Sequence, residues 1–137
     1  MAKGEFKLQA AIRRLIAHMG GKDEKMHGNM YQSGIPDLLV GFNEQFLFIE
    51  LKWKEIYTIG EAFMELRPTQ RKFFLLWKQW PAYILVGRPP FLDEETEVCL
   101  IKASEINSSE FDTRVSWMTL KEATEILFSS TRDSESR

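Results

Sequence analysis

The chain of 137 residues contains one cysteine, two histidines and no long uninterrupted apolar run. A single cysteine excludes an intramolecular disulfide and any zinc site built on several thiolates, and it is typical of a reducing compartment. The longest apolar stretches, residues 46–49 and 73–77, end well before the roughly 20 residues that a membrane span requires. The first residues alternate in charge where a secretory signal would be apolar. We therefore expect an intracellular protein with no membrane-spanning helix.

Cysteine and histidine, the usual protein ligands of zinc and of softer metal ions, are scarce in this chain. Cys99 is expected to be a buried structural thiol. Neither His18 nor His27 has a ligand partner at a metal-binding spacing, so we expect no zinc.

The charge is unevenly distributed along the chain. Residues 1–90 contain 13 Lys and Arg and 9 Asp and Glu, a net charge of +4, whereas residues 91–137 contain 5 and 11, a net charge of −6. The first two thirds are therefore the better candidate for contact with phosphate. A solvated surface that is merely uneven explains the same numbers equally well.

The N-terminal part predicts one helix. Apolar residues recur at helical spacing over residues 6–19, and a Gly-Gly pair follows as a stop signal. Residues 22–32 are polar, with a short strand predicted around Met30 and Tyr31.

A hairpin follows in the middle of the chain. Strands over residues 37–42 and 45–52 are joined through Asn43 and Glu44. The second strand has apolar residues on both faces, which indicates a central position in a sheet.

The next segments complete a predicted α/β fold. Residues 53–66 have weak periodicity and are interpreted as an irregular, mobile segment. Pro68 opens a helix over residues 68–80, and residues 83–87 predict a short buried strand. We expect a mixed central β-sheet flanked by helices.

The C-terminal part extends this core. Residues 98–101 predict an edge strand, and Thr119 with Glu122 matches a capping box that starts a helix to about Phe128. A tail rich in Ser, Thr and charge, residues 129–137, is expected to be disordered. Residues 1–128 are expected to form a single domain, because the chain has room for one core.

The chemically informative pattern is Pro36-Asp37, twelve residues, and then Glu50-Leu51-Lys52. Side chains alternate along a strand, so Glu50 and Lys52 point to the same side and Leu51 points away. Asp37 begins the adjacent strand, so its carboxylate can approach that of Glu50. Charged groups in an apolar strand are unfavourable unless they are paired or bound to a metal ion.

Two neighbouring carboxylates favour a cation between them. Mg²⁺ prefers oxygen ligands and retains waters that it exchanges for phosphate oxygens, and Mn²⁺ serves similarly. With Lys52 to orient water, the expected reaction is phosphodiester hydrolysis. The alternative is structural, with a Glu50–Lys52 pair that braces the sheet and an Asp37 that caps a turn.

These residues resemble the PD-(D/E)xK nuclease signature. Residues 34–38, Gly-Ile-Pro-Asp-Leu, and the later Pro68-Thr69-Gln70 look most like its VRR-NUC branch of stand-alone phage and bacterial nucleases. The resemblance spans about residues 5–88, with residues 91–128 as an extension. It implies a restriction-endonuclease-like core in the order αβββαβ.

The resemblance also implies roles for individual residues. Mg²⁺ would be held by Asp37, Glu50 and the Leu51 carbonyl, with Lys52 as the base or water-orienting group. Gln70 would position Lys52 or the phosphate. Many such nucleases take a further acidic ligand from the first helix, and Glu5 is the candidate there, although it could simply favour the helix dipole.

Several side chains remain open between two uses. Lys54, Arg67, Arg71 and Lys72 could contact DNA phosphates or merely be solvated. Trp53, Tyr57 and Phe63 could stack on a base, cover the core or form a dimer surface.

The expected function is therefore a Mg²⁺-dependent DNA endonuclease. By analogy with resolvases, it would cut branched DNA as a homodimer. The alternatives are a simple nicking or trimming phage endonuclease, and a non-catalytic DNA-binding or assembly module with the same fold.

Overall fold

The structure, a computed structural model, describes residues 3–26, 35–76, 81–106 and 112–135, and side chains as far as residue 129. The strand predicted around Met30 and Tyr31 lies outside these residues. None of the helices described is both long enough and apolar enough to cross a membrane.

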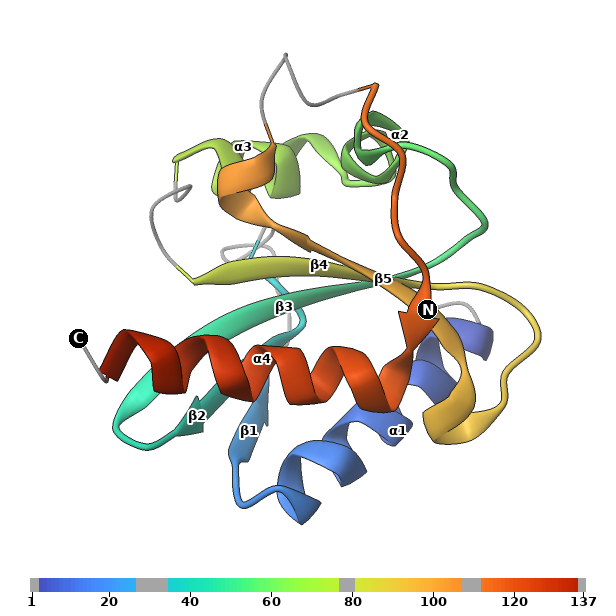
Figure 1. The fold of residues 1–137 in the computed structure, drawn as a ribbon. Coiled ribbons are helices and arrows are strands. Elements are labelled where there is room, and N and C mark those ends of the chain that lie inside the picture. The colour runs from blue at the N-terminus through green and yellow to red at the C-terminus, as the bar shows by residue number, and fades with distance from the viewer. Residues whose placement is uncertain (1–2, 27–34, 77–80, 107–111, 136–137) are drawn as a thin grey trace.

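A six-stranded sheet with strand order β1-β2-β3-β4-β5-β6 forms the centre of the fold (Figure 1). Neighbouring strands are antiparallel except β3 and β4, which are parallel. The expected mixed α/β fold is thereby confirmed. The strands are β1 (Lys22–Lys25), β2 (Leu38–Phe42), β3 (Gln45–Trp53), β4 (Ala82–Gly87), β5 (Glu97–Lys102) and β6 (Met118–Thr119).

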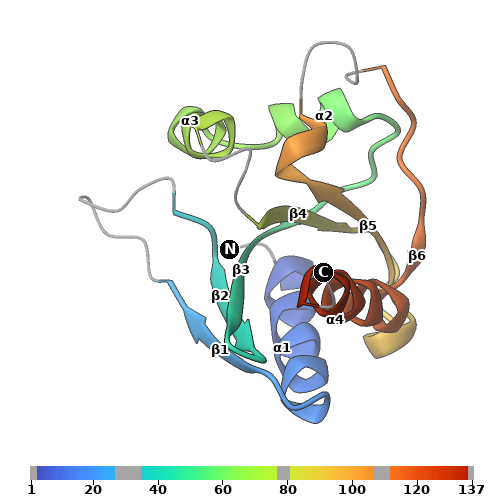
Figure 2. The same cartoon turned by 60° about the vertical axis from the view of Figure 1, so that its left-hand side comes forward.

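Helices cover the two faces of the sheet in pairs (Figure 2). On one face α1 (Lys3–His18) and α4 (Leu120–Glu135) pack over a core to which Leu8, Ile49 and Leu127 belong. On the other face α2 (Ile59–Met64) and α3 (Pro68–Leu76) enclose a second core around Phe74. Two short 3₁₀ helices, η1 (Asp93–Glu95) and η2 (Ala103–Glu105), flank β5.

The central position predicted for β3 is confirmed, because it pairs with β2 on one side and β4 on the other. Its side chains alternate between the two cores, with Leu51 in the first and Phe48 against the second. The β2–β3 connection is the predicted hairpin turn. Asn43 and Glu44 both have positive φ, 48° and 62°, as a two-residue type I′ turn requires.

Two of the longer elements were missed by the sequence patterns, besides β6, η1 and η2. The segment 53–66 is not irregular throughout, because α2 forms within it. A local signal was present: Thr58 and Glu61 have capping-box spacing, and Thr58 Oγ1 accepts a hydrogen bond of 3.2 Å from Glu61 N. The other element, β1, was missed because it is a polar edge strand with no residue fully buried.

The C-terminal elements differ in two respects from the expectations. β5 is not simply an edge strand, because β6 pairs with its first residues. The predicted capping box of α4 is confirmed by reciprocal hydrogen bonds between Thr119 and Glu122. The helix continues to Glu135 and so runs beyond the end predicted near Phe128. Ser, Thr and charged residues are only mildly unfavourable once a packed helix has started, which explains the extension.

Candidate metal centre and active site

Asp37 and Glu50 meet where β2 begins beside the middle of β3. Leu38 pairs with Ile49, so the same register places Asp37 opposite Glu50. Asp37 Oδ2 accepts a hydrogen bond of 2.8 Å from Leu51 N. The Asp37 backbone is also held from the other side, because its carbonyl accepts a bond of 2.8 Å from Met26 N. The carboxylate is therefore fixed against β3.

Glu50 is a buried acid in an unfavourable electrostatic environment. The residue is only 1% exposed. Burial and, after it, the neighbouring Asp37 charge raise the pKa of Glu50 to about 8, although the Lys52 ammonium acts to lower it. One oxygen, Oε1, is buried and accepts no hydrogen bond from the described residues. Such an oxygen is unfavourable unless something outside the chain satisfies it.

Lys52 and Gln70 form a network around the other Glu50 oxygen. Lys52 Nζ lies 3.3 Å from Glu50 Oε2 and donates a hydrogen bond of 3.2 Å to Gln70 Oε1. Gln70 Nε2 in turn donates a bond of 2.9 Å to Glu50 Oε2. The structure thus brings together all three residues, on the side of β3 that faces α3. Each is held by the other two.

The start of α3 explains why Gln70 points into this network. Pro68 is the first residue of the helix, and the Gln70 side chain reaches back so that its Oε1 accepts a hydrogen bond of 2.9 Å from Arg67 N. This is the reach-back half of a capping box, with Arg67 at the cap position. The same amide oxygen accepts from Lys52, so helix capping and site geometry depend on one side chain. Gln70 is accordingly buried.

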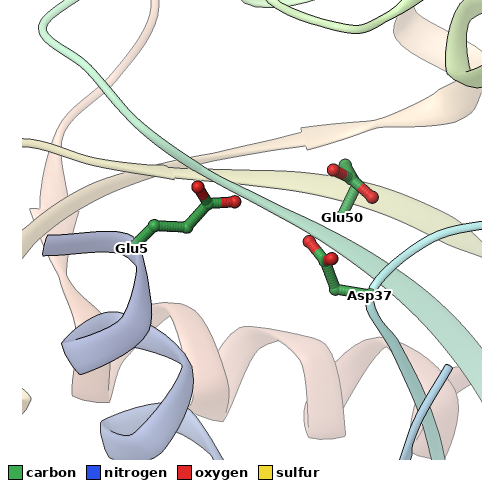
Figure 3. Close-up of side chains that lie close together, drawn as sticks. All are labelled: Glu5, Asp37 and Glu50. Carbon is green, nitrogen blue, oxygen red and sulfur yellow. The ribbon is translucent and has the colours of Figure 1, made fainter. Parts of the chain in front are cut away.

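Glu5 completes a group of three carboxylates (Figure 3). One oxygen each from Glu5, Asp37 and Glu50 lie within 4.8 Å of one another. Glu5 is in the first turn of α1, so the helix-dipole role and the site role coincide. The residue before it, Gly4, lies directly against the Trp53 indole, a contact that sequence reasoning missed. The sequence feature that could have pointed to this contact is Gly4, a glycine immediately before the acidic residue Glu5.

The donor set fits a hard divalent cation. Three converging carboxylates repel each other, and a cation among them would relieve the repulsion and satisfy Glu50 Oε1. All the ligands offered are oxygens, which suits Mg²⁺ or Mn²⁺ rather than a soft metal ion. Glu5, Asp37 and Glu50 would hold the ion. The Leu51 carbonyl lies on the same segment of β3 between Glu50 and Lys52.

The four residues suggested for DNA contact divide into two kinds. Lys54 Nζ pairs with Glu65 at 2.9 Å, and the Arg71 guanidinium donates to the backbone oxygens of Leu66 and Met64. Arg71 therefore serves to cap the end of α2. The side chains of Arg67 and Lys72 are exposed at the start of α3, near Gln70.

The other residues discussed from the sequence lie in different environments. Phe63 is buried in the second core, and Trp53 packs against the first, which favours the core reading for both. Tyr57 is exposed beneath the Arg114 guanidinium. Burial raises the pKa of the Cys99 thiol to about 12, as expected of a structural cysteine. His18 is exposed at the end of α1, and His27 lies outside the described residues.

Comparison with known proteins finds likeness in structure but none in sequence. No protein-family model matches the chain, and no curated protein matches it in sequence. Among solved structures, the chain is similar to the 1.6 Å structure of Hjc, a Holliday junction resolvase from the archaeal hyperthermophile Archaeoglobus fulgidus. The two are 14% identical with a TM-score of 0.51, and the match covers 87% of this chain and 98% of that one. The chain therefore has the fold of this resolvase.

Proposed function

We propose that this protein is a metal-dependent endonuclease that hydrolyses phosphodiester bonds in DNA, with Mg²⁺ as its cofactor. The observation that carries the proposal is the buried Glu50 carboxylate, which has an unsatisfied oxygen next to two other carboxylates and a lysine. A purely structural Glu50–Lys52 pair would not need Glu5 and Asp37 beside it, since both add repulsion. The fold shared with a resolvase supports the same reaction class.

The residues of the site have distinct roles in this proposal. A bound divalent ion would polarise the scissile phosphate and lower the pKa of a water molecule. Lys52 presents its ammonium next to Glu50, where it orients the attacking water and stabilises charge that develops on the phosphate. Gln70 positions Lys52 and Glu50 through its two hydrogen bonds. Arg67 and Lys72, both exposed around the start of α3, contact the DNA backbone.

We further propose branched DNA as the substrate, as in the VRR-NUC-type nucleases that the sequence resembles. The support is the likeness to a protein described as a Holliday junction resolvase. Cutting two strands symmetrically requires two sites related by a two-fold axis, so the active form would be a homodimer.

An apolar surface on the α3 side suits such pairing. Ring contacts link the exposed Phe46 to Phe48 and Phe48 to Phe73, and the exposed Leu76 lies one helical turn after Phe73. Sedimentation of the purified protein tests the dimer, and a monomer at micromolar concentration that still cuts both strands symmetrically would contradict it.

The enzyme is tested by incubation with supercoiled plasmid and with a synthetic four-way junction, in Mg²⁺ or in EDTA. The near-isosteric variants Asp37→Asn, Glu50→Gln and Lys52→Met should each lose at least 100-fold in cleavage rate. The matched controls Glu125→Gln and Lys121→Met change the same residue types on the exposed side of α4 and should cut normally.

Each result selects one function. Metal-dependent cutting that all three site variants lose supports the nuclease, and much faster cutting of the junction than of the plasmid supports the resolvase. Comparable nicking of both substrates would indicate a simple nicking enzyme. Binding without cutting by the unaltered protein would indicate an assembly module, and full activity in the variants would place the chemistry elsewhere.

A further inference from the structure

An exposed phenylalanine stands beside the carboxylate group. Phe6 follows Glu5 in the first turns of α1, and 60% of its surface is exposed. The Cα atoms of Phe6 and Glu5 are about 3.8 Å apart because the two residues are consecutive. The Phe6 side chain therefore starts close to a residue that belongs to the site. Leu8, two positions on, is fully buried in the first core. Phe6 therefore contributes little to the packing of α1.

A lysine from β1 lies over the same ring. Lys25 Nζ is 5.9 Å from the centroid of Phe6, within the range of a cation–π contact. Lys25 pairs with Leu38, the residue that follows Asp37, and the next amide, Met26 N, bonds to the Asp37 carbonyl. Phe6 follows Glu5 in the chain, and Lys25 is paired with the residue that follows Asp37. An aromatic face and an ammonium thus stand together on the two elements that carry Glu5 and flank Asp37.

We propose that Phe6 and Lys25 form a subsite for one unpaired nucleotide next to the scissile phosphate. The Phe6 ring stacks on the nucleobase, and the Lys25 ammonium contacts the adjoining phosphate. This inference rests on the proposed nuclease function and adds a preference for DNA in which a base has left the stack, as at a branch point. Stacking on an aromatic ring is available to every base, so the subsite selects strand structure and not sequence.

The chemistry of the Phe6–Lys25 pair favours a nucleotide over a protein partner. An apolar protein surface that covered Phe6 would also have to bury the Lys25 ammonium and the neighbouring Glu5, which is unfavourable without added partners. A nucleotide supplies a π-face for the ring and an anion for the ammonium in one unit.

Binding is measured in EDTA, so that no DNA is cut, by fluorescence anisotropy with three labelled probes: oligothymidylate, an abasic deoxyribose-phosphate chain of equal length, and a fully paired duplex. Phe6→Leu keeps an apolar side chain and removes the ring. It should weaken oligothymidylate binding about tenfold and leave the other two probes unchanged. Phe6→Tyr should restore binding. Lys25→Gln should weaken the binding of all three probes. It should also reduce the slope of log affinity against log salt concentration by about one.

Tyr57→Leu is the matched control, because Tyr57 is also exposed beneath a cation but belongs to the segment before α2. It should leave all three affinities unchanged.

The subsite is overturned if Phe6→Leu weakens binding of the thymidylate and abasic probes equally, or weakens neither. A changed sedimentation coefficient with unchanged DNA affinity would assign Phe6 to a protein interface instead. If the unaltered protein cuts plasmid but the variants do not show the expected binding changes, only the subsite proposal is rejected. If it neither binds nor cuts DNA, the proposed function falls with it.

Discussion

Gly4 in the first turn of α1 lies directly against the indole of Trp53 at the end of β3. A Cβ atom on Gly4 would overlap the five-membered ring of that indole. The same indole packs against Gly87 of β4, where an added Cβ would lie 2.9 Å from Trp53 Cε3. Trp53 is therefore held between two glycines. Because Glu5 follows Gly4, this contact determines where the third carboxylate stands.

Gly4→Ala should consequently weaken metal binding. Alanine is the better helix former by about 1 kcal/mol, but here its methyl group meets a ring that is fixed on both sides. We expect the first turn of α1 to move away with Glu5, and divalent-ion affinity to fall at least as far as in Glu5→Gln. Calorimetric titration with Mn²⁺ measures both variants.

The matched control for Gly4→Ala is Ala10→Gly, at an exposed position of the same helix. It should lower stability by about 0.5–1 kcal/mol through helix propensity alone and leave metal affinity intact. A Gly4→Ala protein that binds Mn²⁺ as tightly as the original would show that the Trp53 contact does not place Glu5.

The raised pKa of Glu50 predicts the pH dependence of stability in EDTA. The folded pKa is about 8 and the ordinary value is 4.5, so between these values the folded protein holds a proton that the unfolded chain releases. Stability is therefore highest below about pH 4.5 as far as Glu50 is concerned, and it falls as pH rises toward 8, by up to about 1.4 kcal/mol per pH unit.

Urea unfolding at pH 5, 6.5 and 8 tests this dependence. Glu50→Gln cannot ionise, so it should remove the decline and be more stable than the original protein at pH 8 in EDTA. Adding Mg²⁺ should stabilise only the original protein. A Glu50→Gln protein with the same decline would assign the titration to another group.

Gln70→Leu tests the positioning network. The change keeps most of the volume but removes the donor to Glu50 Oε2 and the acceptor for Lys52 Nζ and Arg67 N. Loss of such supporting hydrogen bonds typically lowers activity about 10- to 100-fold. We expect this loss in kcat with little change in KM, since Gln70 is buried and bonds to Glu50, Lys52 and Arg67. Thr69→Val, at an exposed neighbouring position, should cut normally.

The β2–β3 turn offers a test that is independent of the site. Glu44 has a φ of 62°, a conformation that glycine adopts without strain. Glu44→Gly should therefore stabilise the protein by about 0.5–1 kcal/mol in urea unfolding and leave cleavage unchanged. Leu39→Gly, within β2, should destabilise it instead. Destabilisation by Glu44→Gly would mean that the type I′ turn is not formed.

The central part of the site could be predicted from the sequence because it depends on local geometry. Strand alternation puts Glu50 and Lys52 on one side, and the short turn at Asn43 and Glu44 fixes the register that brings Asp37 opposite Glu50. The hairpin alone therefore assembles these three residues. Gln70 was indicated only by a family resemblance, and its orientation comes from the cap of α3.

The place of Glu5 could not be read from the sequence. It depends on how α1 packs across the sheet, and that packing rests on a contact between Gly4 and the distant Trp53. The Phe6–Lys25 pair has the same origin, since it joins α1 to an edge strand that has no apolar pattern. Tertiary contacts of this kind leave no periodic signal in either segment.

The central claim is that Glu5, Asp37 and Glu50 share one divalent ion, and Mn²⁺ titration calorimetry at pH 8 tests it most directly. The unaltered protein should bind Mn²⁺ at a carboxylate site, and Glu5→Gln, Asp37→Asn and Glu50→Gln should each weaken that binding at least tenfold. Glu122→Gln, an acid exposed at the start of α4, should bind as the original does. Unchanged Mn²⁺ affinity in Asp37→Asn or Glu50→Gln would contradict the account.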